Sequence, residues 1–518
     1  MTKKILIFLI LLSIFSFGLR ASALRINHPF WVDEFSSGRQ ALLLKEIVLE
    51  GQSNLLPFIE ANNSLTHLLI AVSFAIAGVS ETTARFPSVI FGALLPAALF
   101  LLGKKLFSTR VAVVAAVLCA CSYLEITWST QARGYVLQQF LGVLALLSYY
   151  QWKEKFQAKW LLSLSILTLL GFFTHVLFAF VVIAIAIDFV ITKPRELRRL
   201  LSRRSTHILG LVFVVVGAVL AYRLGIIQLL TNGVTFGFFA LHNNLWYYHA
   251  LLWREQTLLT LLLFIGILWQ LRHFRSTPWA IFILLALQVV FVTFFFGHYM
   301  TKYLVPVIQY FFLFAAVGAS AIADGVTRNS SQAPRKTITL GVLCILVLFI
   351  LVNGDNFVLK PKPYYSVNKD MRDIALVDYH QAYNIIQQKG QFAQGQTAVI
   401  ETWPDRPRWY LGEDNSYFIF RWEDEGFHKQ TAFSLNELNE KVVADQHNIR
   451  LISTVADLQN VMATYPRGFL WIDDSSLPAD VIAYAQEHLH TELKTDHYIY
   501  DENPYSLWPA TLYSWGVE

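Results

Sequence analysis

The chain has 518 residues, of which 55% are hydrophobic and 15% are charged, and its mean hydropathy is positive. This composition excludes an ordinary soluble protein and predicts a polytopic membrane protein. The net charge of +5 reflects basic cytoplasmic loops in such a protein, so it does not indicate a nucleic-acid partner. Cys119, Cys121 and Cys344 all lie inside apolar runs, so the sequence shows no disulfide framework and no metal-type cysteine spacing.

The N-terminal segment combines a short basic stretch with an apolar run from Ile5 to Leu19. Ala21-Ser22-Ala23 resembles a signal-peptide cleavage site, so this segment is either a cleaved signal peptide or an uncleaved first span. We favour the uncleaved span. In both cases Asp33 and Glu34 follow on the outer side of the membrane.

Apolar segments recur along the first 353 residues. A helix needs roughly 20 apolar residues to cross the bilayer core, and several of these segments approach that length. The candidate segments are residues 5–24, 64–79, 84–102, 111–124, 134–150, 160–173, 175–192, 207–225, 250–271, 278–297, 303–323 and 337–353.

The distribution of lysine and arginine decides which segment does not cross. Cytoplasmic loops carry the excess of these residues, and the basic clusters of this chain all fall inside only if residues 64–79 stay on the outer side. That segment is short and opens with the polar residues Asn62, Asn63 and Ser64. We therefore expect about eleven transmembrane helices and one long first outer loop, residues 25–83, that contains juxtamembrane helices.

A change in composition marks the C-terminal part of the chain. From Asp355 onward no apolar run is long enough to cross a membrane, and charged residues are frequent. We expect a transmembrane catalytic domain over residues 1–354, which includes the first outer loop, and a soluble mixed α/β domain over residues 355–518 on the outer side, acting as a lid or an acceptor-docking domain. Strand-like runs occur at 397–401, 416–420 and 468–472, and helix-like runs at 370–388, 455–465 and 478–488.

Both signs of charge gather in the predicted outer loops. Asp33 and Glu34 stand where the first span meets water, and a carboxylate there can deprotonate an alcohol or amine nucleophile. Cations on neighbouring loops suit a phosphate, because arginine offers a rigid bidentate fork and lysine a mobile point charge. The cations and a histidine that supplies a further hydrogen-bond donor are Arg85, Arg133, Lys302 and His175.

Each of these residues also has a purely structural explanation. The two carboxylates are typical of the start of a solvated loop. Arg85 suits an interface anchor, His175 a hydrogen-bonded helix end, and Lys302 a snorkelling side chain. A group of both signs near the membrane edge favours chemistry. If the leaving group is a polyprenyl phosphate, positive side chains stabilise it and a single carboxylate base suffices; the sugar then passes through an oxocarbenium-like state.

Three motifs match a known family in order and spacing: Ser80-Glu81-Thr82-Thr83-Ala84-Arg85-Phe86-Pro87-Ser88, Gly103-Lys104-Lys105-Leu106-Phe107, and Trp128-Ser129-Thr130-Gln131-Ala132-Arg133-Gly134-Tyr135. Together with Asp33-Glu34 and with Phe173-Thr174-His175, they make the chain resemble membrane glycosyltransferases of the GT-C fold. The resemblance is to bacterial relatives of dolichyl-phosphate-mannose protein mannosyltransferases (family 39) and of aminoarabinose lipid A transferases (family 83). It covers about residues 5–190, with the later spans in outline.

This resemblance implies transfer of a sugar, with inversion, from a polyprenyl-monophosphate donor to a protein, lipid or glycan acceptor at the outer face of the cytoplasmic membrane. It implies Asp33 as the catalytic carboxylate and Glu34 as its partner or an acceptor contact. Where many relatives carry a His-Pro-Pro-Leu-Tyr run, this chain has Asn63-Ser64-Leu65-Thr66-His67. No cofactor is predicted, and divalent-metal dependence stays open. The residues expected near the donor are Arg85, Arg133, Tyr135, His175, Lys302 and Tyr303.

Two other functions stay open on the sequence alone. A transporter or flippase of a lipid-linked sugar would also bind a polyprenyl phosphate, but such proteins place ionisable residues near the bilayer midplane and show paired repeats with broken helices. A non-enzymatic assembly or polysaccharide-binding protein would carry its glycan-binding activity in the soluble domain.

Overall fold

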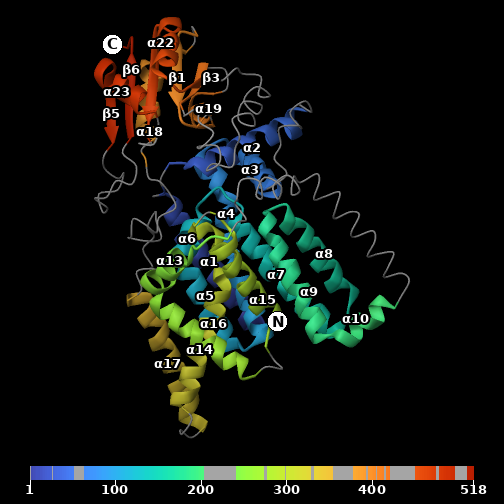
Figure 1. Ribbon diagram of the computed structural model, residues 1–518. Coiled ribbons are helices and arrows are strands. Elements are labelled where there is room, and N and C mark those ends of the chain that lie inside the picture. Colours follow the sequence, from blue (N-terminus) through green and yellow to red (C-terminus); the bar gives the residue numbers. More distant parts are fainter. Residues whose placement is uncertain are drawn as a thin grey trace. The chain divides into compact units, whose positions relative to one another are not determined.

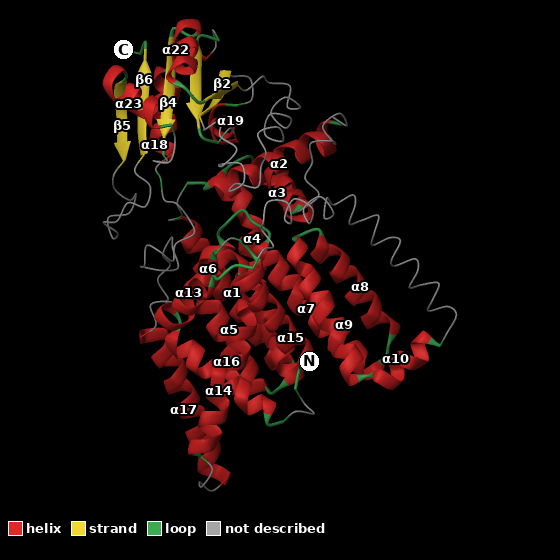
Figure 2. Ribbon diagram, in the orientation of Figure 1, coloured by secondary structure: helices red, strands yellow, loops and turns green. Residues whose placement is uncertain are grey.

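Contacts divide the chain into two compact units, Met1–Asn27 with Glu60–Asp373 and His28–Ile59 with Ile374–Glu518. The first is helical, and the second contains a β-sheet (Figure 1, Figure 2). The computed structural model describes residues 2–25, 27, 29–51, 63–202, 241–273, 277–297, 299–327, 332–353, 377, 379–392, 395–403, 405–412, 416–420, 450–473, 478–495 and 510–517.

The first unit contains helices that suit a multi-pass membrane protein. Among the described residues, α1 (Lys3–Arg25), α4 (Glu81–Leu106) and α16 (Val305–Val326) are each long and apolar enough to cross a bilayer. A further candidate, Leu245–Glu255 with Thr257–Leu271, bends by 102° at its break. The predicted number of about eleven spans is not confirmed, and segment 207–225 lies outside the described residues.

The first unit also contains helices over most of the other predicted apolar segments, including 64–79, and short elements between them (Figure 1). They are α3 (Ser64–Ala77), α5 (Thr109–Cys121), α6 (Tyr123–Ser129), α7 (Tyr135–Lys155), α8 (Ala158–Phe172), η2 (Val176–Phe178), α9 (Ala179–Thr192), α10 (Pro194–Leu201), α13 (Leu245–Ala250), η3 (Leu251–Glu255), α14 (Thr257–Leu271), α15 (Trp279–Val290), η5 (Phe291–Phe295), η6 (Thr301–Tyr303) and α17 (Gln332–Asn353).

Buried polar contacts join helices that are far apart in sequence. Arg20 of α1 is fully buried, and its Nε donates to Ser129 Oγ of α6 at 2.9 Å. A second contact of this kind involves Gln139 of α7, whose Nε2 donates to Glu125 Oε1 at 2.9 Å and to Gln309 Oε1 of α16 at 3.0 Å. These bonds pair polar atoms that would otherwise be costly to bury, and they fix α6 just before the Arg133 loop.

The second unit is built on a six-stranded sheet of order β3-β2-β1-β4-β6-β5. The strands β3, β2, β1 and β4 run parallel, and β6 is antiparallel to both β4 and β5. The expected α/β character is therefore present, while the antiparallel edge was not predicted. The elements are α18 (Tyr379–Lys389), β1 (Thr397–Glu401), α19 (Asp405–Leu411), β2 (Ser416–Phe420), β3 (Arg450–Ile452), α22 (Val455–Thr464), β4 (Arg467–Ile472), α23 (Ala479–His488), β5 (His490–Thr495) and β6 (Ala510–Trp515).

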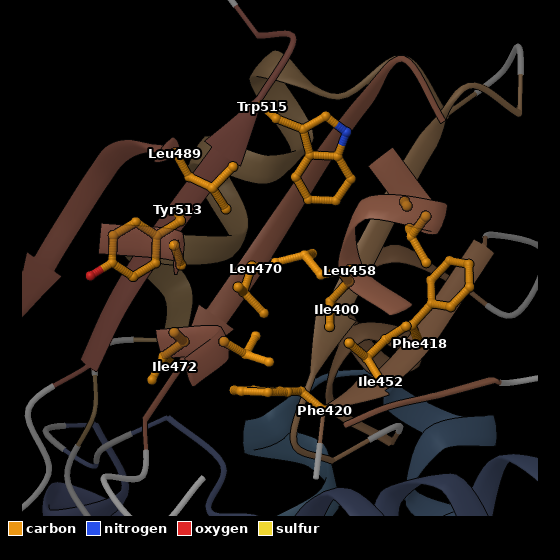
Figure 3. Close-up of a cluster of buried hydrophobic side chains, with 14 residues drawn as sticks. Ile400, Phe418, Phe420, Ile452, Leu458, Leu470, Ile472, Leu489, Tyr513 and Trp515 are labelled. Atoms are coloured by element: carbon orange, nitrogen blue, oxygen red, sulfur yellow. The ribbon is translucent and has the colours of Figure 1, made fainter. Parts of the chain in front are cut away.

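One apolar core stabilises this sheet. Figure 3 shows Ile400 and Leu470 of neighbouring parallel strands facing Leu458 of α22. Burial on both faces is typical of parallel strands, and β1 is buried at all five positions. The remaining labelled members of the cluster are Phe418, Phe420, Ile452, Ile472, Leu489, Tyr513 and Trp515.

The helix that follows the first span belongs to this second unit. The sequence interpretation kept residues 25–83 with the transmembrane domain, whereas contacts group His28–Ile59 with the C-terminal residues. The reason is aromatic packing by α2 (Val32–Glu50), because Phe35 lies 6.0 Å from Tyr379 and 5.7 Å from Tyr410, centroid to centroid. The predicted domain boundary between residues 354 and 355 lies outside the described residues.

Candidate active site

The two predicted carboxylates occupy the first turn of α2 and differ in their surroundings. Glu34 is fully buried, and its Oε2 accepts a hydrogen bond from the backbone N–H of Trp31 at 3.4 Å. A carboxylate in this position also faces the positive end of the helix dipole. Asp33 is partly exposed, and its backbone carbonyl accepts from the Ser37 hydroxyl at 3.2 Å. Asp33 is therefore the more exposed of the two residues.

Arg85 lies in the second turn of α4, in the first unit. The start of α4 is fixed by a capping box, in which Ser80 Oγ accepts from the Thr83 N–H at 3.1 Å and Thr83 Oγ1 accepts from the Ser80 N–H at 3.0 Å. Arg85 is buried, with its Nη1 3.9 Å from Glu81 Oε2. The motif that runs from Ser80 to Ser88 thus starts α4 and places one cation, Arg85, near the N-terminal end of that helix.

Arg133, Tyr135 and His175 form a contact cluster. The Arg133 guanidinium carbon lies 5.9 Å from the centre of the Tyr135 ring, and that ring lies 5.5 Å from the His175 ring. The loop is held from α4, because Ser88 Oγ donates to the Arg133 carbonyl at 3.2 Å. Arg85 lies one turn before Ser88 on the same helix, so the two arginines belong to neighbouring elements of one unit.

Lys302 is linked to the cluster through the electrostatic effect of its charge on His175. The charges of Arg133 and Lys302 both act on the His175 ring, whose Nδ1 accepts from the Leu177 N–H at 3.1 Å. Lys302 is buried, and its Nζ lies 5.4 Å from the Tyr303 ring centre. The structure therefore places Arg133, Tyr135 and His175 in a chain of ring and cation contacts, with the Lys302 charge acting on His175.

The sequence interpretation did not include two residues that border this cluster. His67 of α3 is buried with its Nδ1 lacking a hydrogen-bond partner, and the Arg133 charge acts on it. Gly134 marks the point where three segments meet, because a Cβ there would lie 2.8 Å from Thr66 Oγ1 and 2.9 Å from the Thr174 carbonyl. The signal for Gly134 was its place directly after the arginine, and the signal for His67 was the run Asn63-Ser64-Leu65-Thr66-His67, which stands where many relatives carry His-Pro-Pro-Leu-Tyr.

The structure does not bring all predicted residues into one compact unit. Arg85, Arg133, Tyr135, His175, Lys302 and Tyr303 belong to the first unit, whereas Asp33 and Glu34 belong to the second. Within the described residues, no group of three or more His, Cys, Asp or Glu side chains is arranged to hold a metal ion.

Comparison with known proteins supports the predicted resemblance. The model of the family described as dolichyl-phosphate-mannose-protein mannosyltransferase matches residues 64–222, which contain Arg85, Arg133 and His175. No curated protein sequence matches the chain.

Solved structures match almost the whole chain. ArnT from Cupriavidus metallidurans bound to undecaprenyl phosphate superposes with a TM-score of 0.59 at 10% identity, covering 98% of this chain and 97% of that chain. The same protein in its apo state gives 0.60 at 11% identity with the same coverage. AglB, an oligosaccharyltransferase from Archaeoglobus fulgidus in complex with an inhibitory peptide and a dolichol-phosphate, gives 0.54 at 11% identity, covering 90% of this chain and 69% of that chain.

At these identities the structural similarity establishes the fold. The chain has an ArnT-like fold, mostly helical with a small C-terminal sheet. The resemblance to GT-C membrane glycosyltransferases that the sequence predicted is therefore confirmed.

Proposed function

From this resemblance, we propose that the chain is a membrane glycosyltransferase that moves a sugar from a polyprenyl-monophosphate donor to an acceptor at the outer face of the cytoplasmic membrane. The observation that carries the proposal is the cluster of Arg133, Tyr135 and His175, with Lys302 in electrostatic range. Cations beside aromatic rings suit a phosphate that is attached to an apolar chain. Two similar structures support it: ArnT is bound to undecaprenyl phosphate, and AglB is in complex with an inhibitory peptide and a dolichol-phosphate.

The cluster would bind the donor phosphate. Arg133 and Lys302 neutralise its charge, and their stabilisation increases as the bond to the sugar breaks, because negative charge then develops on the departing oxygen. Burial of Lys302 strengthens such interactions by excluding water. Arg85 adds a second arginine on the neighbouring helix, where it is paired with Glu81.

Asp33 would act as the general base. It takes the proton from an acceptor hydroxyl or amine, the acceptor atom forms a bond to the anomeric carbon, and the bond from that carbon to the phosphate oxygen breaks with its electron pair. The products are the glycosylated acceptor, with inverted configuration, and free polyprenyl phosphate. Glu34, which is buried and bonded to the Trp31 N–H, would hold the first turn of α2.

The experiment uses the full-length protein reconstituted in lipid nanodiscs. Undecaprenyl phosphates that carry mannose, glucose or aminoarabinose are incubated with it, and the release of undecaprenyl phosphate and of sugar products is followed by mass spectrometry. The same measurement on envelope lipids and glycans of a deletion strain identifies the missing sugar. We expect a sugar-linked product that depends on both Asp33 and Arg133.

Two results would contradict the proposal. One is normal envelope glycosylation in the deletion strain together with no release of undecaprenyl phosphate from any donor. The other is movement of a labelled donor across a sealed vesicle membrane without any transfer product, which would identify a flippase instead.

A further inference from the structure

The strand order of the sheet in the second unit changes direction between β1 and β4. These two parallel strands are adjacent, yet β2 and β3 lie on one side of β1, while the next strand in sequence, β4, lies on its other side. The strand order therefore reverses between β1 and β4. In open α/β sheets this reversal opens a crevice at the carboxyl edge, which is where functional groups usually collect.

One arginine contacts the carboxyl ends of both strands. Arg406 of α19 is fully buried, and its Nη1 lies 2.9 Å from Glu401 Oε2, at the end of β1. The same nitrogen donates to Asp473 Oδ2, directly after β4, at 2.8 Å. The Arg406 guanidinium also stacks 4.2 Å from the ring centre of Tyr379.

Neighbouring hydroxyl groups complete this network. Thr402 Oγ1 donates to Asp473 Oδ1 at 2.9 Å, and the Tyr383 hydroxyl donates to Glu401 Oε1. Two carboxylates around one guanidinium, each with an additional donor, make a buried ion group, in which Arg406 Nε has no hydrogen-bond partner among the described residues. Such a group has a single favourable geometry, so it fixes the position of α19 on the sheet.

Helix α19 in turn packs on α2. The ring of Trp409 lies 5.0 Å from that of Phe30, and Tyr410 lies 5.7 Å from Phe35, centroid to centroid. The approach is close because residue 38 is a glycine, since a Cβ there would lie 3.0 Å from Trp409 Cζ3. Asp33 is therefore part of a helix whose buried face is shaped by α19.

We propose that Arg406 is a positioning residue: by fixing α19 on the sheet it holds α2, and with it Asp33, in the orientation needed for sugar transfer. The C-terminal unit would then serve the reaction directly, beyond any role in docking an acceptor. The part of this inference that concerns transfer rests on the function proposed above, whereas the anchoring of α2 does not. A displacement of about 1 Å in a reacting group is enough to reduce turnover about 10²-fold.

Two kinds of variant test the anchoring independently. Arg406→Lys keeps the positive charge but loses the planar group that reaches both carboxylates and stacks on Tyr379. Gly38→Ala and Gly38→Leu leave the ion group intact and insert increasing volume between α2 and Trp409. Glu492→Gln is the matched control, because it removes a salt bridge to Lys389, with Nζ and Oε2 2.7 Å apart, at another place in the same unit.

The measurements use full-length protein in nanodiscs. Hydrogen exchange followed by mass spectrometry reports on α2 and, as an internal reference, on β1 and β4. Steady-state kinetics with the active polyprenyl-phosphate donor give kcat and KM, and the binding of undecaprenyl phosphate is measured separately.

We expect Arg406→Lys and Gly38→Leu to increase exchange in α2 by about tenfold or more and to lower kcat by about 10- to 100-fold. The KM for the donor and the binding of undecaprenyl phosphate should change by less than about threefold, because the phosphate cluster belongs to the other unit. Gly38→Ala should lie between Gly38→Leu and the unsubstituted protein. Glu492→Gln should match the unsubstituted protein in both α2 exchange and kcat.

Unchanged α2 exchange in both Arg406→Lys and Gly38→Leu would overturn the anchoring, as would an equal effect of Glu492→Gln. Faster α2 exchange with unchanged kcat would overturn the positioning role. If Arg406→Lys unfolds the unit, seen as faster exchange in β1 and β4, Gly38→Leu still decides. If the unsubstituted protein transfers no sugar from any donor, the proposed function fails, while faster α2 exchange in the variants still supports the anchoring.

Discussion

The Glu34 carboxylate accepts a hydrogen bond from the backbone N–H of Trp31, three residues earlier, and so closes the first turn of α2. Asp33, its neighbour, is partly exposed. The adjacent carboxylates, which look equivalent in the sequence, therefore have different surroundings: one helps to begin a helix, and the other is accessible.

This difference leads to the first prediction. Asp33→Asn should lower kcat by about 10²- to 10⁴-fold, the usual contribution of a general base, without changing hydrogen exchange in α2. Glu34→Gln should keep most of the activity, because the amide oxygen still accepts from Trp31. Glu34→Ala should loosen the first turn of α2 by about 1 kcal/mol, as loss of a cap does.

Kinetics and hydrogen exchange on the same three preparations check this prediction. A similar loss of kcat in Asp33→Asn and Glu34→Gln would show that both carboxylates take part in the chemistry. Near-normal turnover in Asp33→Asn would remove Asp33 from the mechanism altogether.

The second prediction concerns the donor phosphate. Arg133→Ala should lower kcat by about 10²- to 10³-fold, as loss of one charged donor at a developing oxyanion does, and should also weaken undecaprenyl phosphate binding. Arg133→Lys should restore part of the binding, because it keeps the charge but loses the bidentate fork. Titration with undecaprenyl phosphate and donor kinetics measure the two effects separately.

Arg110→Ala is the control for this experiment. Arg110 is an exposed arginine of the same unit, with its Nη1 3.5 Å from Asp324 Oδ1. Replacing Arg110 with alanine should change neither kcat nor the binding of undecaprenyl phosphate. An equal loss of binding in Arg110→Ala and Arg133→Ala would indicate a general charge effect rather than a phosphate site.

How far the sequence predicts this molecule depends on the range of the interactions involved. Strands β1 and β2 were predicted with their observed ends, because short apolar runs with β-branched and aromatic residues are local signals. Strand β5, His490–Thr495, was not predicted, since its polar residues are stabilised by pairing with β6 rather than by their own pattern.

The candidate site also combines features that local sequence signals predicted with features that depend on long-range contacts. The Arg133, Tyr135 and His175 group was predicted because motifs within the match to a known family carry these residues. The assignment of α2 to the C-terminal unit was not predicted, because the contacts of Phe30 and Phe35 with Trp409 and Tyr410 join segments more than 370 residues apart. No local pattern encodes such pairings.

The third prediction is a pH dependence of stability in the C-terminal unit. Partial burial opposes ionisation of Glu492, but hydrogen bonds from Lys389 and Ser514 outweigh it and lower the pKa of this carboxyl. A lowered pKa in the folded state stabilises the fold above the unfolded-state pKa of about 4.3. This stabilisation is lost as the pH falls through the folded-state pKa.

The comparison of the unsubstituted protein with Glu492→Gln isolates this effect from other titrating groups. At pH 7 the variant should be less stable by about 1 kcal/mol, the scale of a partly exposed ion pair, and the difference should shrink towards zero as the pH falls below about 4. Hydrogen exchange of β6, which carries Ser514, measures it in the full-length protein. A difference that stays constant down to low pH would show that the pair contributes by packing alone.

The fourth prediction concerns the buried hydrogen bond between Arg20 Nε and Ser129 Oγ, which are 2.9 Å apart and join α1 to α6. Ser129→Ala leaves a buried charged donor without this partner, at a cost of about 1–3 kcal/mol. Ser165→Ala is the control, because Ser165 Oγ donates only within its own exposed helix, to the Leu161 carbonyl at 3.0 Å. Thermal unfolding in detergent should therefore show a lowered Tm for Ser129→Ala and an unchanged Tm for Ser165→Ala. Since α6 leads directly into the Arg133 loop, Ser129→Ala should also weaken undecaprenyl phosphate binding, and a lowered Tm with unchanged binding would mean that the bond stabilises the fold without shaping the phosphate site.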